Sequence, residues 1–152
     1  MFSEEEIKII KEATKEFFKK TTFDCQIDFY APEERTLPIN VRTDEPQILI
    51  GEGGQTLAEI QHLLKAIIKK KIEEQFYVNL DINSYKEKKT EHLKEMANSM
   101  ADEVSLLKKE KTLAPMPAYE RRIVHMELAK RNDVATESIG EDPDRRLVIK
   151  PN

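Results

Sequence analysis

Two short segments carry residue types at spacings that could bind a phosphate chain. The first is residues 50–57, where the sequence I-G-E-G-G-Q-T-L places three glycines directly before a predicted helix. Glycines allow a backbone to approach a sugar-phosphate chain closely, and the first N–H groups of a helix point towards an anion. The segment lacks the Gly-Lys-Ser/Thr of a P-loop, and its third glycine is misplaced for a dinucleotide-binding loop. A phosphate-binding loop and a simple tight turn both remain open as interpretations.

The second segment contains Arg121 and His125, four residues apart in a predicted helix. This spacing places both side chains on one face of the helix, one turn apart. The guanidinium could hold a phosphate bidentately while the imidazole donates a hydrogen bond to it. Spacing alone favours the alternative, which is a surface arginine beside a histidine that packs near the core.

Two more arginines, Arg145 and Arg146, follow a predicted turn near the end of the chain. The turn contains Gly140, Glu141, Asp142 and Pro143 between two predicted strands. Arg145 and Arg146 strengthen the Arg121–His125 segment as a candidate anion-binding site, because they add two positive charges on a closing strand.

Hydrophobic periodicity predicts the elements that must position these residues. In the first half of the chain it predicts a helix over residues 3–20 and strands over 25–29 and 37–41. A short apolar piece at 48–50, a helix over 55–71 and a strand over 76–82 follow. Ser3 and Glu6 form the pattern of a capping box at the start of the first helix.

The second half of the chain shows a different order of elements. It predicts a long helix over residues 85–109, a helix over 118–131 and strands over 134–139 and 145–150. Residues 113–117 are predicted to be extended because two prolines exclude a helix there. The predicted fold class is α+β with two small domains. Residues 1–83 would form a three-stranded sheet with helices on one face, and residues 84–152 a small sheet with two helices.

The charge of the chain bears on its partners. Charged residues make up 36% of the sequence and the formal net charge is −4. Lysines and glutamates alternate along the predicted helices, so most of this charge is interpreted as solvated helix surface. The negative balance argues mildly against a nucleic-acid partner, but binding depends on local fields and a basic patch suffices.

Cysteine and histidine usage excludes several kinds of site. Cys25 is the only cysteine, and it alternates with Ile27 and Phe29, which predicts a buried thiol rather than a nucleophile. The three histidines are scattered and form no metal-ligand cluster. There is no signal peptide, and no apolar run approaches the roughly 20 residues of a membrane span. We therefore expect a cytoplasmic protein with no cofactor, metal or membrane partner.

The glycine segment in its context resembles a KH domain of the prokaryotic arrangement. The pattern I-G-x-x-G-x-x-L-x-x-I follows two strands and precedes a helix and a strand. KH domains clamp about four nucleotides of a single strand at this loop. The family usually places Lys or Arg between the two glycines, whereas this sequence has Glu52 and Gly53 there. The loop is therefore expected to bind weakly, with partial compensation from Lys65 and the cluster Lys69–Lys71.

Two segments of the second half resemble the R-three-H domain. They are the helical segment Y-E-R-R-I-V-H at residues 119–125 and the hairpin S-x-G-E-x-P-x-R-R-x-V-I at residues 138–149. They are similar in particular to the version that follows a KH domain in the Jag, or SpoIIIJ-associated, family of bacterial proteins. The resemblance covers about residues 20–150 and includes motifs of both domains in the family's order. Many members carry an additional N-terminal module. This sequence begins almost directly at the KH region, so the functions of that module are not expected here.

The resemblance implies binding of single-stranded nucleic acid, mainly RNA and possibly also DNA, by both modules. It suggests RNA-chaperone or post-transcriptional regulatory duties. Glu120 and Glu141 would position arginines rather than touch phosphate. The nucleic-acid-binding residues that it implies are Gly51, Glu52, Gly53, Gly54, Gln55, Arg121, Arg122, His125, Arg145 and Arg146.

The sequence also bears on two other classes of function. Glu52 and the net negative charge favour a protein-interaction scaffold that dimerises through its KH fold and binds RNA weakly. The resemblance also implies pairing, as a homodimer or with a separate small KH-domain protein. An enzyme is not expected, because the chain has no metal cluster or nucleotide-phosphate motif, and Ser138 and His125 have no visible third catalytic group.

Overall fold

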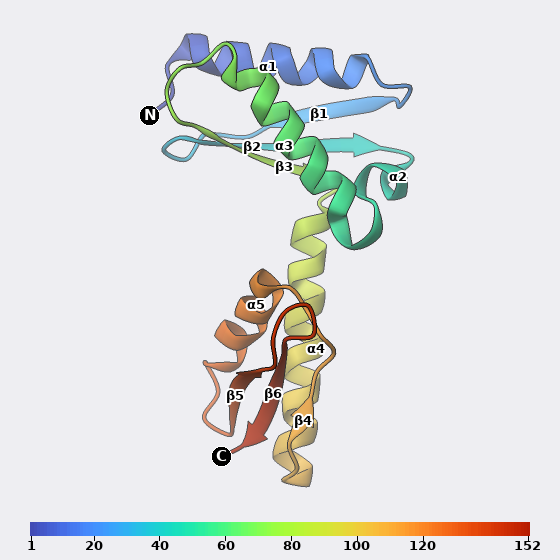
Figure 1. Cartoon of the computed structure of the whole chain (residues 1–152), viewed down its shortest axis with the longest axis vertical. Helices are drawn as coiled ribbons and strands as arrows, with labels where there is room; N and C mark the ends of the chain where they lie inside the picture. The colour runs from blue at the N-terminus through green and yellow to red at the C-terminus, as the bar shows by residue number, and fades with distance from the viewer. The chain divides into compact units, whose positions relative to one another are not determined.

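The chain forms two units that each combine helices with a three-stranded sheet (Figure 1). The structure is a computed structural model and describes residues 1–152. The two units are Met1–Lys86 and Glu87–Asn152. The predicted α+β class with two small domains is confirmed, and each unit is described by itself below.

The first unit has the element order that the sequence predicts. Its two hairpin strands, the short helix, the glycine turn and the following helix occur in sequence before the last strand. The elements are α1 (Glu4–Lys19), β1 (Cys25–Phe29), β2 (Thr36–Thr43), α2 (Pro46–Ile50), a 3-10 turn (Glu52–Gly54), α3 (Gln55–Lys69) and β3 (Tyr77–Ile82).

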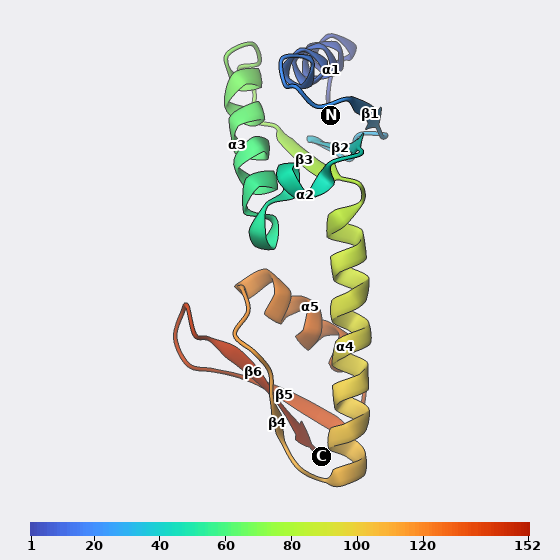
Figure 2. The same cartoon turned by 90° about the vertical axis from the view of Figure 1, so that its right-hand side faces the viewer.

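The sheet of the first unit has the strand order β1-β2-β3. β1 pairs antiparallel with β2, and β2 pairs parallel with β3. The register aligns Leu37 with Val78, Ile39 with Leu80 and Val41 with Ile82, all of them buried. Because successive side chains alternate between faces, this register gives one apolar face, which α1 and α3 cover (Figure 2).

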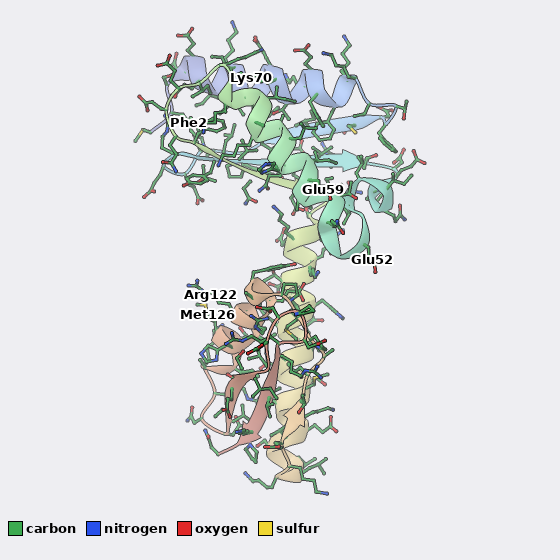
Figure 3. The ribbon with its side chains drawn as sticks, in the orientation of Figure 1. Phe2, Glu52, Glu59, Lys70, Arg122 and Met126 are labelled. Carbon is green, nitrogen blue, oxygen red and sulfur yellow. The ribbon has the colours of Figure 1, made fainter.

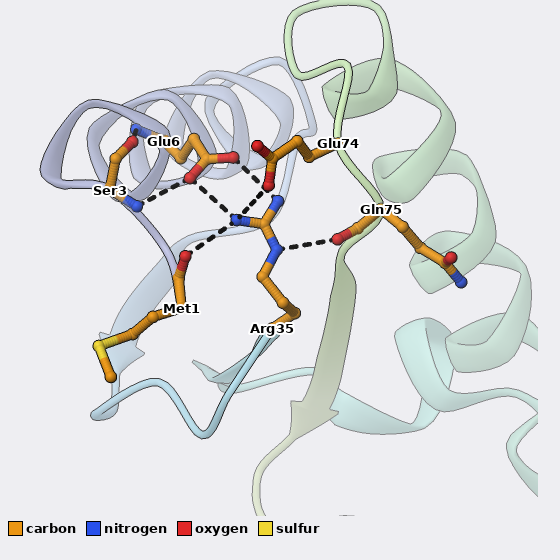
Figure 4. A network of polar contacts seen from close by, with 6 residues as sticks. All are labelled: Met1, Ser3, Glu6, Arg35, Glu74 and Gln75. Carbon is orange, nitrogen blue, oxygen red and sulfur yellow. Dashed lines mark hydrogen bonds and ion pairs between the residues drawn. The ribbon is translucent and has the colours of Figure 1, made fainter.

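Arg35 connects three separate segments of the first unit (Figure 4). Its guanidinium donates two hydrogen bonds to the Glu6 carboxylate, at 2.9 and 3.0 Å, and one to the carbonyl of Gln75 at 2.9 Å. Glu6 is also the second partner in the predicted capping box with Ser3, which the structure confirms. These contacts lower the pKa of Glu6 from its ordinary 4.5 to about 2, chiefly through the hydrogen bonds from Arg35.

The second unit places two helices on one face of a small sheet. Its elements are α4 (Tyr85–Leu107, whose first two residues belong to the first unit), β4 (Lys111–Thr112), α5 (Ala118–Leu128), β5 (Val134–Ile139) and β6 (Arg146–Pro151). The strand order is β4-β6-β5, with both pairs antiparallel. Leu147 and Ile149 on β6 join Val104 of α4 and Leu128 of α5 in one buried cluster.

The segment between α4 and α5 is extended, as its prolines predict. Only Lys111 and Thr112 pair as a strand, but the chain beyond them still runs along β6. The N–H of Leu113 donates to the carbonyl of Leu147 at 2.8 Å, and the N–H of Met116 donates to the carbonyl of Arg145 at 3.3 Å. This segment therefore carries the start of α5 close to the β5–β6 hairpin. None of the helices combines the length and the apolar character that crossing a bilayer would require.

Candidate nucleic-acid interface

The glycine loop of the first unit connects α2 to α3 through three left-handed glycines. Gly51, Gly53 and Gly54 have φ values of 72°, 60° and 83°. Gly54 is the N-cap of α3, where no side chain bonds to the first N–H groups of the helix. The N–H of Gly54 donates to the carbonyl of Gly51 at 3.3 Å and that of Gln55 to the carbonyl of Glu52, so what this loop chiefly offers an anion is the positive end of the helix dipole. This is the backbone chemistry that the sequence pattern indicates.

Two of the glycines are required by what surrounds them. A Cβ on Gly51 would lie 2.2 Å from the Oγ1 of Thr56, and one on Gly54 would lie 3.0 Å from the ring of Tyr85. A Cβ on Gly53 would meet nothing within 4 Å. Gly51 and Gly54 therefore hold the loop closely against the start of α3 and against Tyr85, while Gly53 faces open space.

Glu52 is exposed at the tip of the loop and projects away from it (Figure 3). Gln55, the first residue of α3, is also exposed and donates from its Nε2 to Glu59 at 3.2 Å. A carboxylate at this position repels phosphate, and no lysine or arginine forms an ion pair with Glu52.

The lysines expected to compensate for Glu52 lie far along α3. Lys69 is the last residue of the helix, and at about 1.5 Å per residue it stands about 21 Å from Gln55. Lys65 is about 15 Å away on the same scale, and its Nζ lies 4.6 Å from the centre of the Tyr77 ring. The expectation that these lysines support the loop is therefore wrong, because the helix carries them away from it.

Arg121 in the second unit is mostly buried. Its Nη1 donates to the carbonyl of Met116 at 2.7 Å and to Asp142 at 3.1 Å. One nitrogen thus holds together the segment before α5 and the hairpin loop. The other guanidinium nitrogens, Nε and Nη2, make no hydrogen bond within the protein, and no buried side-chain nitrogen lacks a partner. They therefore reach the surface and can donate to an anion there.

His125 and Arg145 are brought together by two hydroxyl groups of β5. His125 Nδ1 lies 2.5 Å from the Oγ1 of Thr136, and Arg145 Nε donates to the Oγ of Ser138 at 2.9 Å. Thr136 and Ser138 are two residues apart, so they share a face of the strand at a separation of about 7 Å. His125 and Arg145 are both exposed. His125 Nε2 makes no bond within the protein, so it stays available to a ligand.

Arg122 and Arg146 lie elsewhere on the same unit. Arg122 is exposed on α5 and makes no hydrogen bond or ion pair. Arg146 pairs with Ile139 in the sheet, and its Nε donates to the carbonyl of Asp144 at 2.9 Å. Alternation along β6 turns Arg146 to the face opposite Leu147, away from the helices. The structure therefore gathers Arg121, His125 and Arg145, which we call the Arg/His cluster, and separates Arg146 from it.

Several residues that shape this site were not identified from the sequence. Thr136 and Asp142 fix His125 and Arg121, and only the fold brings them near, since they lie 11 and 21 residues away. Glu120 was expected to position an arginine, but it accepts from the Tyr119 hydroxyl at 2.9 Å and pairs with Lys89 at 2.7 Å. Burial, followed by the bond to Glu120, raises the pKa of Tyr119 and keeps its phenol protonated.

Comparison with known proteins agrees with the division of the chain into two kinds of unit. The family model for the KH domain matches residues 8–92, and the model for the R-three-H domain matches residues 91–151. The KH match alone covers more than half of the chain. The two models meet within α4, the helix that begins at the junction.

Curated bacterial relatives are similar to this chain over most of its length. A protein of Clostridium symbiosum called RNA-binding protein KhpB is 37% identical over 120 residues, which are 79% of this chain and 54% of the relative. Proteins of the same name from Lactiplantibacillus plantarum and Bacillus subtilis are 35% and 32% identical, over 84% and 76% of this chain. The matches span 39% of the former and 57% of the latter, so the chain corresponds to about half the length of these relatives. With a KH domain followed by an R-three-H domain, and with these relatives, the chain belongs to the Jag family.

Proposed function

We propose that the chain is a single-stranded nucleic-acid-binding protein that acts mainly on RNA and carries no catalytic activity. The observation that carries this proposal is the Arg/His cluster, in which three cationic or hydrogen-bonding side chains share one surface. Arg121 contributes Nε and Nη2, Arg145 its free terminal nitrogens and His125 its Nε2. Donors of this kind bind phosphate oxygens. The curated relatives, which are named as RNA-binding proteins, support the same function.

The binding residues proposed for the first unit are Gly51, Glu52, Gly53, Gly54 and Gln55. Here the backbone N–H groups at the start of α3 would contact phosphate, while Glu52 weakens the contact. Arg122 and Arg146, which belong to the same unit but lie outside the Arg/His cluster, are the remaining proposed binding residues. The proposed functional domains are residues 1–83 and 84–152. The protein is proposed to be cytoplasmic and to act as an RNA chaperone or a post-transcriptional regulator. DNA is the competing ligand to test.

Pairing of chains is a further part of the proposal. Two copies, or one copy and a separate small KH-domain protein, would associate through the KH fold. Light scattering of the protein alone and of the mixture measures the masses directly. A strictly monomeric protein in both samples contradicts the pairing and leaves the RNA-binding proposal unaffected.

The test of RNA binding is a titration of labelled single-stranded RNA at several salt concentrations. We expect the slope of log affinity against log salt to be about −0.7 for each phosphate contacted. The double variant His125→Ala/Arg145→Ala removes two exposed donors of the cluster, and we expect it to lower affinity about 10- to 100-fold. It should also make the slope shallower.

Lys130→Ala is the matched control for that experiment. Lys130 is an exposed cation of the same unit that pairs with Glu127, so its removal changes the net charge without touching the cluster. We expect its effect on affinity to be within about 2-fold, as is usual for screened surface charges. Equal effects of the double variant and the control would contradict the proposed site, and no binding by the unmodified protein would contradict the proposed function.

A further inference from the structure

Helix α5 presents a second exposed stripe beside the Arg/His cluster. Tyr119 and Met126 are 55% and 57% exposed, and Arg122, which lies between them in the sequence, is exposed as well. At about 100° of rotation per residue, the three side chains fall within about 60° of the helix circumference. Figure 3 shows Arg122 and Met126 as neighbours that project from the same side of α5 into solvent.

The Tyr119 ring is held in place although it is exposed. Its hydroxyl donates to Glu120 Oε1 at 2.9 Å, and the same oxygen accepts from Lys89 Nζ at 2.7 Å. Glu120 is only 8% exposed, so this anchor lies within the unit, between α4 and α5. A ring fixed at its hydroxyl end loses little freedom when a planar group stacks on it.

Arg122 lies at the edge of the stripe that is nearest to the Arg/His cluster. His125 is about 60° away from Arg122 around the helix, and Met126 is about 40° away in the opposite sense. Arg122 makes no hydrogen bond or ion pair, so both the charge and the flat face of its guanidinium are unused within the protein. Planar guanidinium groups stack on bases and rings, and they also bind phosphate.

We propose that Tyr119, Arg122 and Met126 form a platform on which bases of single-stranded RNA stack while the Arg/His cluster holds the adjoining phosphates. This inference rests on the proposed function and adds to it a surface for the bases. Stacking on aromatic side chains beside a basic backbone groove is a general mode of single-strand binding. The platform extends about 10 Å along α5, from Tyr119 to Met126, at about 1.5 Å per residue.

The charge around the stripe favours RNA over an apolar protein surface as its occupant. Arg122 borders the two exposed side chains Tyr119 and Met126, and His125 of the Arg/His cluster lies on the other side of Arg122. A wholly apolar partner would leave the charge of Arg122 without a counterpart, whereas an RNA strand supplies both a phosphate and a base.

The test uses two RNA oligomers of equal length, one of uridylate and one of abasic ribose-phosphate units. Tyr119→Ala is expected to lower the affinity for oligouridylate about 5- to 30-fold, which is the effect of losing one stacked base. Its affinity for the abasic chain should stay that of the unmodified protein, because the phosphate contacts remain. Tyr119→Phe keeps the ring but loses its anchoring bond, so it should lose less affinity for oligouridylate than Tyr119→Ala and none for the abasic chain. Met126→Ala should follow Tyr119→Ala with a smaller loss.

Tyr30→Ala is the matched control, because Tyr30 is an equally exposed tyrosine, at 54%, in the first unit. Thermal unfolding of each variant separates loss of binding from loss of fold. Equal affinities of the unmodified protein and Tyr119→Ala for oligouridylate would overturn the platform, as would an equal loss on the abasic chain. Either result leaves the phosphate site intact, whereas failure of the unmodified protein to bind any RNA would overturn the proposed function itself.

Discussion

The glycine loop of the first unit and the Arg/His cluster of the second offer an anion two different kinds of donor. The loop offers the backbone dipole at the start of α3, whose direction depends on the positive φ values of Gly51, Gly53 and Gly54. The cluster offers side chains, whose direction depends on partners such as Asp142, Thr136 and Ser138. A backbone site can therefore keep its shape while an added charge weakens it, which is the effect that we propose for Glu52.

The two sites also differ in what damages them. The loop tolerates a change of charge but not of backbone shape, because a Cβ on Gly51 would overlap Thr56. The cluster should keep its geometry only while its partners Thr136, Ser138 and Asp142 remain. Mutations that separate shape from charge therefore test this difference.

The largest effect on the first unit is expected for Gly51→Ala. The added Cβ would lie 2.2 Å from Thr56 Oγ1 at a φ of 72°, so both overlap and backbone strain oppose it. Strain of this kind costs about 1–3 kcal/mol, and the overlap adds to it. Chemical denaturation should show a loss at the upper end of this range or above.

Gly53→Ala is the control for that experiment, since it has a similar φ of 60° but nothing within 4 Å of the new Cβ. We expect it to cost about 1 kcal/mol. Similar losses for both variants would show that the contact with Thr56 is unimportant. Binding through the second unit should persist in both, which would confirm that the two sites depend on different features.

An intermediate effect is expected for Glu52→Lys, which restores the charge that KH loops usually carry. Replacing a repulsion by an attraction at the exposed loop should raise RNA affinity about 3- to 10-fold at low salt, with a smaller gain at high salt. Glu73→Lys makes the same change of charge beyond the far end of α3 and is the control. If both substitutions raise affinity equally, the gain comes from net charge, and the loop is not a binding site.

The smallest effect concerns acid stability. The folded-state pKa of Glu6 is about 2, below its ordinary 4.5, so its stabilising contribution is complete above pH 4.5 and is lost as pH falls towards 2. Glu6→Gln should lower the free energy of unfolding of the first unit near neutral pH, and the difference from the unmodified protein should shrink below pH 4.5. Chemical denaturation at a series of pH values measures this difference in the free energy of unfolding.

Asp133→Asn makes the equivalent change in the second unit, where the hydrogen bonds from Arg131 also lower the pKa of the carboxylate. The two variants should act on different unfolding transitions if the units unfold separately. A pH-independent difference between Glu6→Gln and the unmodified protein would show that Arg35 does not depend on the charge of Glu6.

Much of the local structure was determined by the sequence alone. The capping box of Ser3 and Glu6, the alternation along β1 and β2 and the periodicity of α3 depend on neighbouring residues, and all were predicted correctly. The element order of the first unit also follows from such local patterns, whereas the two-residue strand β4 of the second unit was not predicted. The motifs around Gly51–Gly54 and Arg121–His125 were sufficient to indicate the family, because a motif is a property of the chain rather than of its packing.

Which side chains meet was decided only by the tertiary structure. The resemblance placed Arg121 at the site with Arg122, Arg145 and Arg146 flanking it. In the structure Arg121 is largely buried and bonded to Met116 and Asp142, while strand alternation turns Arg146 away. The sequence suggested that Lys65 and the cluster Lys69–Lys71 would partly compensate for the charge of Glu52. Helix α3 instead carries these lysines away from the glycine loop. Glu120 was expected to position an arginine, and its bonds to Tyr119 and Lys89 were not predicted, because they form only once α4 brings Lys89 beside α5. Local patterns specify helices and strands, whereas contacts between distant residues depend on how those elements pack.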